Sequence, residues 1–337
     1  MTMMTRISAL AFATAMAQPV AAETVMRFSD YLPATHYLTV EGSMPFMEAV
    51  KAATGGEVSF QHFPAQQLGK STDFLRLTTG NVAQISVVGV SFVADKMELS
   101  NVAQMPGIFP SACKGLEAYD AILDTTPLRE KDFTQHGVKL LMAYVLPPFE
   151  LASTSKPVNS IADMQGMKIL VASRATELLM NEIGAAPIQA TSGAAAYEDV
   201  KRGTIDGLIF APDSMLAYDL HTVTKYGTTN GNFGGQVVAV IMNQGAYDAL
   251  DDATKKVFDD AAAAAQQRVC EYVDAKKAQA LEKIVANGNE MTTFGEDQLA
   301  ILAEAGDKVA EAWAKELDSR GVAGSETLDA FRAAVGE

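Results

Sequence analysis

The chain has 337 residues, 48% of them apolar, and its 26 basic and 41 acidic residues give a formal net charge of −15 at pH 7. No basic cluster occurs along it, so nucleic acid and anionic membranes are poor partners for its surface. The length and the apolar content allow a large core and favour two domains.

The first 22 residues have the layout of a secretory signal peptide. Arg6 precedes an apolar run at 7–17, and Val20 and Ala22 suit a signal peptidase. The apolar run is shorter than the about 20 residues that cross a bilayer as a helix. We therefore expect cleavage after Ala22 and a soluble mature protein in the periplasm. A buried N-terminal helix is the alternative, but no polar face runs through the segment.

Strands and helices alternate along the rest of the chain. Apolar runs and alternating patterns predict strands at residues 25–29, 58–63, 85–90, 138–145, 168–171, 207–210 and 237–242. Helices are expected at residues 44–53, 71–79, 113–123, 175–183, 194–202 and 253–287. Apolar strands that alternate with helices indicate sheets covered on both faces, and so an α/β fold.

The segment 253–287 is expected to form one long helix. It contains no Gly or Pro, is rich in alanine, and has acidic residues early and lysines late. At 1.5 Å per residue such a helix is about 50 Å long, which is more than one small domain needs. We expect it to lie across two lobes. Because no Pro/Gly/Ser linker is present, we also expect the chain to cross between the lobes more than once.

Two cysteines, Cys113 and Cys270, lie far apart in the sequence. A disulfide needs Cα atoms within about 7 Å, which the sequence does not show, so we expect two buried thiols and keep a disulfide as the alternative. The four histidines stand apart without metal-site spacing, and we expect no metal and no cofactor. A secreted hydrolase is disfavoured because no Gly-x-Ser-x-Gly elbow is found.

Five further stretches are informative together, and they lie at residues 64–69, 105–109, 155–169, 183–188 and 196–207. In this order they resemble signatures of the periplasmic receptors of tripartite ATP-independent periplasmic (TRAP) transporters of the DctP type. The resemblance covers essentially the whole mature chain. It implies a two-lobed receptor with a long helix across both lobes, with lobe I at 23–149 plus about 237–272 and lobe II at 150–236 plus about 273–337. It also implies a monomer that captures a small organic solute by lobe closure, delivers it to TRAP membrane permease subunits, and is not an enzyme.

At the expected ligand site, this chain departs from the usual sequence of the family it resembles. In most of the family an arginine follows the Lys-Ile of the third stretch and binds the ligand's carboxylate through two parallel hydrogen bonds. Here that position is Leu170, and a second position that is often basic is Glu150. These changes suggest a ligand that is an amine, a zwitterion or neutral. Alternatively, Glu150 points to solvent.

Other candidate residues follow from their places beside strands and helices. Arg174 lies near a helix N-terminus and is the alternative anchor for a carboxylate, or a surface residue. Asp213 follows the strand at 207–210, at the end where ligands of open α/β sheets collect. Aromatic walls could come from Tyr31, from Tyr37 beside His36, and from Phe92, Phe149, Phe210 and Phe233.

Overall fold

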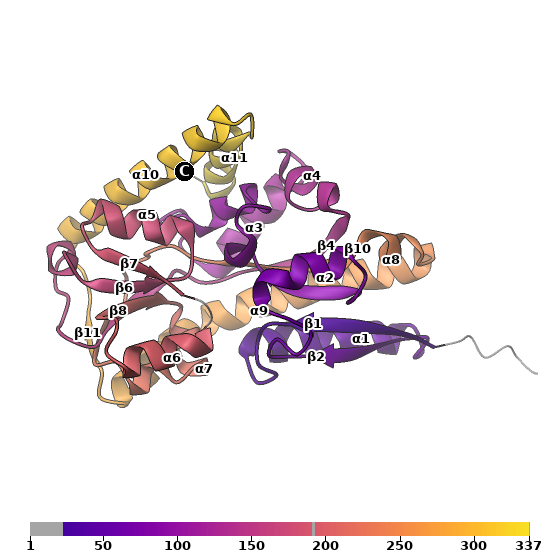
Figure 1. The fold of residues 1–337 in the computed structure, drawn as a ribbon, viewed down its shortest axis with the longest axis horizontal. Helices are drawn as coiled ribbons and strands as arrows, with labels where there is room; N and C mark the ends of the chain where they lie inside the picture. Colours follow the sequence, from indigo (N-terminus) through magenta and orange to yellow (C-terminus); the bar gives the residue numbers. More distant parts are fainter. Residues whose placement is uncertain (1–22, 191–192, 337) are drawn as a thin grey trace, which may run out of the picture.

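The computed structural model describes residues 23–190 and 193–336, and it consists of two β-sheets flanked and connected by helices (Figure 1). The predicted signal peptide lies outside the described residues. Within the described part of the chain, none of the helices combines the length and the apolar character that crossing a membrane requires.

The first sheet has five strands, in the order β2 (Val58–Phe63), β1 (Thr24–Asp30), β3 (Ile85–Gly89), β10 (Val237–Asn243) and β4 (Val138–Val145). β1 runs parallel to β2 and β3, whereas β10 runs antiparallel to β3 and β4. The helices of this part are α1 (Met44–Ala53), α2 (Phe74–Thr79), α3 (Ala112–Ile122), α4 (Leu128–Asp132) and α8 (Gln244–Asp248). We call this sheet and its helices the first lobe.

The second sheet has six strands, in the order β11 (Glu290–Thr292), β9 (Tyr226–Thr228), β5 (Glu150–Ser153), β8 (Gly207–Phe210), β6 (Lys168–Val171) and β7 (Ala186–Gln189). With α5 (Arg174–Glu182), α6 (Gly193–Lys201) and α7 (Pro212–Ala217) it forms the second lobe. Short helical turns are η1 (Thr39–Ser43), η2 (Ser71–Asp73), η3 (Val90–Val93), η4 (Leu99–Gln104), η5 (Thr134–His136), η6 (Ile161–Met164) and η7 (Leu220–Thr222).

Four segments carry the chain between the lobes, and the last of them is the C-terminal pair of helices described below. Residues 146–149 lead from β4 to β5, and residues 229–236 lead back from β9 to β10. The third is α9 (Asp252–Ala286), which packs against α1, α3 and β4 of the first lobe and against α7 of the second (Figure 1). The predicted long helix is therefore confirmed, and the side chain of Asp251 caps it by accepting a hydrogen bond from Thr254.

The C-terminal helices return toward the first lobe. α10 (Glu296–Ser319) packs on α5, and α11 (Gly324–Val335) packs on α3 (Figure 1). The expected placement of all of 273–337 with the second lobe is therefore wrong for α11. The buried faces of α10 and α11 are apolar, and packing them against both lobes removes that surface from water.

Cys113 and Cys270 form a disulfide, so the expectation of two buried thiols is wrong. Their Cα atoms lie 4.8 Å apart although 157 positions separate them in the sequence. α3 packs directly against α9 in the first lobe, and this tertiary contact brings the two side chains together. No sequence pattern near either cysteine predicts that contact.

Candidate ligand-binding pocket between the lobes

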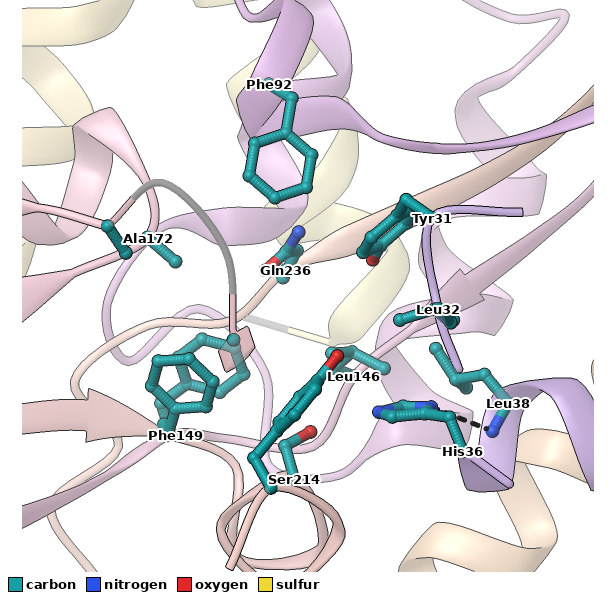
Figure 2. A pocket seen from close by; sticks show the side chains of 14 residues that line it. Tyr31, Leu32, His36, Leu38, Phe92, Leu146, Phe149, Ala172, Ser214 and Gln236 are labelled. Carbon is teal, nitrogen blue, oxygen red and sulfur yellow. Dashed lines mark hydrogen bonds between the residues drawn. The ribbon is translucent and has the colours of Figure 1, made fainter. Parts of the chain in front are cut away.

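A pocket lies between the two lobes, at the carboxyl ends of parallel strands from both sheets (Figure 2). Tyr31 follows β1 and Phe92 follows β3, while Ala172, Ala190 and Phe210 stand at the ends of β6, β7 and β8. The remaining described lining residues are Leu32, His36, Leu38, Leu146, Phe149, Gly193, Ser214, Tyr218 and Gln236. Loops at this edge of parallel strands are where α/β proteins bind ligands.

Six of the 14 described lining residues, counting His36, carry aromatic rings. Phe149 and Phe210 stack with ring centroids 6.3 Å apart, and Tyr31 meets Phe92 edge to face at 5.3 Å. His36 of the first lobe lies 5.5 Å from Tyr218 of the second. Such a wall suits a planar or apolar ligand body, which it can bury against ring faces and edges.

His36 is neutral and presents a hydrogen-bond donor. The backbone N–H of Leu38 donates to its Nδ1 over 3.2 Å, so Nδ1 carries no proton and the ring hydrogen resides on Nε2. Burial lowers the pKa of His36 to about 3, because the charged form is poorly solvated there. His36 is thus an uncharged donor at neutral pH.

The other polar groups of the wall are also uncharged. Burial raises the pKa of the Tyr31 and Tyr218 phenols, and the nearby Asp30 carboxyl raises both further. The described residues that line the pocket include no Lys, Arg, Asp or Glu. Asp30 itself is fully buried behind the wall, where it accepts hydrogen bonds from Leu32 and Thr39. The described lining therefore offers uncharged hydrogen-bond donors and no cationic side chain.

Five of the predicted site residues line this pocket: Tyr31, His36, Phe92, Phe149 and Phe210. Phe233 does not, because it is fully buried and packs edge to face against Phe294.

Glu150 is buried, and its carboxylate is already engaged. It accepts hydrogen bonds from Thr228 and Gly231 and forms an ion pair with Lys277. The alternative that it points to solvent is therefore wrong. Its role in binding a ligand amine stays a prediction, and Glu150 is not among the described residues that line the pocket.

Leu170 lies behind the pocket wall. The strand register pairs Glu150 with Phe210 and Leu170 with Leu208. Glu150 and Leu170, the two positions that are often basic in the family, therefore lie on one face of the second sheet. Leu170 is fully buried there in an apolar cluster that includes Phe210 and Ala196, and it is not among the residues that line the pocket.

Arg174 and Asp213 line two other cavities. Arg174 is exposed, pairs with Glu177 at 2.5 Å, and borders a cavity with Trp313 and Arg320. Asp213 borders a cavity beside α9, and its Oδ2 is buried without a hydrogen-bond partner among the described residues. Burial raises the pKa of Asp213 to about 6.

Several residues that line the pocket were not predicted from the sequence. Ala172 and Ala190 directly follow predicted or observed strands, so the rule that ligands collect at strand ends could have found them. Ser214 and Tyr218 come from α7 and the turn after it, and Gln236 immediately precedes β10. No pattern in the sequence distinguishes these polar residues from other loop residues.

Comparison with known proteins gives relatives along almost the whole chain. The ectoine-binding periplasmic protein TeaA of Halomonas elongata is 27% identical over 278 residues, which are 79% of this chain and 78% of the relative. A TRAP solute-binding protein from a marine metagenome, specific for aromatic acids and bound to 3-hydroxybenzoate, has a TM-score of 0.85 at 23% identity and covers 93% of this chain and 98% of its own. A Bordetella pertussis extracytoplasmic solute receptor that binds pyroglutamic acid has a TM-score of 0.82 at 23% identity, covering 92% and 99%.

These structures share the two-lobed fold described above. Residues 28–316 match the family of bacterial extracellular solute-binding proteins, family 7, of the DctP type. Proteins of this family bind small solutes outside the cytoplasm and work with TRAP membrane permease components; they are not enzymes. The chain belongs to this family and is a TRAP solute-binding receptor.

Proposed function

We propose that this receptor works in the periplasm as a monomer and captures a small, ring-containing solute without net negative charge, either neutral, zwitterionic or an amine. The observation that carries the proposal is the pocket wall, which is aromatic and whose described residues bear no charged side chain. The receptor then passes the solute to its membrane permease.

The electrostatics of the pocket support this ligand class. A carboxylate in a closed pocket must exchange its water for charged or well-aligned donors, since an unpaired buried ion is very costly. Here the donors are neutral, and the described lining residues include no Lys or Arg that could pair with a carboxylate. Aromatic faces, in contrast, attract cations and pack against apolar rings.

Lobe closure is the proposed mode of capture. His36 and Tyr37 of the first lobe meet Tyr218 and Ser214 of the second, and these contacts close one side of the pocket. Parting the lobes breaks them and opens the pocket to water. A ligand that touches both lobes shifts the population toward the closed state.

A second candidate ligand is an aromatic carboxylate. It is favoured by the aromatic wall and by two similar structures, the metagenomic receptor bound to 3-hydroxybenzoate and one from Rhodoferax ferrireducens bound to benzoate. In this case neutral donors from His36 and Tyr31 hold the carboxylate. Alternatively, Arg174 breaks its ion pair with Glu177 and itself binds the carboxylate, as a shifted anchor.

Three compounds that differ only in one group separate the two candidates. Benzamide is neutral, benzylamine is a cation and benzoate is an anion, and ectoine adds a zwitterion. We expect calorimetry to find at least one of benzamide, benzylamine and ectoine bound at least about tenfold more tightly than benzoate, a difference of about 1.4 kcal/mol.

Two variants of the receptor serve as controls. Phe149→Ala removes part of the pocket wall and should weaken every bound compound, whereas Arg174→Ala should change none. Benzoate as the tightest ligand, with its binding lost in Arg174→Ala, would overturn the proposed ligand class and establish the shifted anchor.

A further inference from the structure

The side chain of Glu150 contacts the returning crossing at 229–236 and the long helix α9. Glu150 is itself the first residue after the crossing at 146–149. Its Oε2 accepts hydrogen bonds from the Thr228 hydroxyl at 2.8 Å and from the Gly231 backbone N–H at 2.7 Å. Its Oε1 accepts one from Lys277 Nζ on α9 at 3.2 Å. We call these four residues the crossing anchor.

The crossing anchor joins segments that are distant in sequence. Thr228 ends β9 and Gly231 lies in the returning crossing at 229–236, so this carboxylate ties both crossings to one point. Lys277 lies in the part of α9 that follows the disulfide at Cys270, which fixes the helix to the first lobe. The anchor therefore connects two crossings to a helix that the disulfide holds to the first lobe.

Because Glu150 is buried, the position of its carboxylate depends on these contacts. The Glu150 side chain is 1% exposed and that of Lys277 is 28% exposed. A buried carboxylate that loses a charged partner has no water to replace it, so its position is tightly coupled to that partner. The exposed ion pairs of α9, such as Lys256 with Asp260, lack this property because water and salt screen them.

We infer that Glu150 is a positioning residue for lobe movement: by fixing both crossings to α9, it confines the lobes to a narrow range of relative orientations. Hinge motion arises from rotation about a few backbone bonds in the crossings. With both crossings held at one point, these rotations are coupled and the lobes turn about a common axis. The inference rests on the proposed lobe closure.

The test measures the distance between the lobes in the protein without ligand. Lys51→Cys on α1 and Lys201→Cys on α6 place spin labels on exposed positions of the two lobes, and the native cysteines stay blocked in their disulfide. Pulsed electron paramagnetic resonance then gives the distribution of label distances. We expect Glu150→Gln and Lys277→Met each to broaden this distribution at least about twofold, and the double variant to broaden it no further.

A matched control and a folding check separate positioning from general destabilisation. Asp260→Asn makes the same acid-to-amide change in an exposed pair of α9 and should leave the distribution unchanged. Circular dichroism and melting curves identify any variant that does not fold; if Glu150→Gln fails, Lys277→Met decides. Distributions in the folded variants that match wild type would overturn the inference.

The proposed lobe closure is tested separately in the same labelled wild-type protein. Saturating benzamide, benzylamine, ectoine or benzoate should shorten the label distance when it binds. If a compound binds without any shortening, closure is wrong, while the role of Glu150 is still judged from the ligand-free distributions.

Discussion

The hydroxyl oxygens of Tyr37 and Ser214 lie 3.3 Å apart, so one hydrogen bond joins the first lobe to the second beside the pocket. Tyr37 also stacks on His36, which lines the pocket, and Ser214 lines it from the other side. This contact exists only when the lobes are together. It should therefore slow the release of ligand.

Removing the Tyr37 hydroxyl tests that role. A hydrogen bond of this kind contributes about 0.5–1.5 kcal/mol, so Tyr37→Phe should speed ligand dissociation about two- to tenfold and leave association nearly unchanged. Stopped-flow fluorescence with the tightest compound of the benzamide series measures both rates. Tyr119→Phe is the control, because it removes a similar bond to Ser100 within the first lobe alone. Equal dissociation rates in Tyr37→Phe and wild type would contradict the prediction.

The disulfide should stabilise the first lobe without affecting the pocket. It joins α3 to α9 across 157 residues of chain, and loss of a native disulfide costs about 2–5 kcal/mol. We expect the double variant Cys113→Ser/Cys270→Ser to lose about this much in urea unfolding while its ligand affinity is unchanged. Reduced wild type should behave like the variant, and reductant should not affect the variant. A large loss of affinity would show that the bridge also positions the crossings.

Asp213 should make the protein less stable as the pH rises. Burial raises its pKa to about 6, with Lys283 and Lys276 opposing, above the unfolded value of 3.8. The folded chain therefore binds the proton more tightly, and this stabilising contribution is complete below pH 3.8 and lost as the pH rises through 6.

The variant Asp213→Asn should thus be more stable than wild type at pH 8, by about 1–3 kcal/mol, because it removes a buried charge that has no hydrogen bond on Oδ2. At pH 4 the gain should be much smaller. Melting curves at both pH values check this, with Asp260→Asn as an exposed control. A gain that is equal at pH 4 and pH 8 would show that ionisation of Asp213 is not its cause.

The structural elements and site residues that depend on a local sequence pattern could be predicted. The segment 253–287 lacks helix breakers and forms α9, and strand ends led to Tyr31, Phe92 and Phe210, which line the pocket. The sequence could not predict the partners of buried charges. Glu150 is neutralised by Lys277, 127 positions away, and no local pattern links them.

The same limit applies to Arg174 and to the two cysteines. Arg174 begins α5 and pairs with Glu177 on the same helix, which fits the alternative that it is a surface residue. Cys113 and Cys270 meet only because α3 packs on α9. Each outcome depends on tertiary packing rather than on the residues nearby in the sequence.

A substitution at Leu170 tests directly whether this position sets the ligand class. It is fully buried, yet it belongs to the same apolar cluster as Phe210, which lines the pocket. An arginine at this position is long enough to extend toward the pocket. Without a partner, however, its buried charge is costly, by several kcal/mol.

We therefore expect Leu170→Arg to lower the melting temperature of the ligand-free protein and to reverse its ligand preference. Benzoate supplies the missing partner charge, so it should raise the melting temperature of the variant more than benzamide does, the opposite of wild type. Leu170→Met is the control for packing alone, because it changes shape but adds no charge. If Leu170→Arg keeps the preference of Leu170→Met, the arginine does not reach the ligand, and the absence of a charge at this position does not set the ligand class.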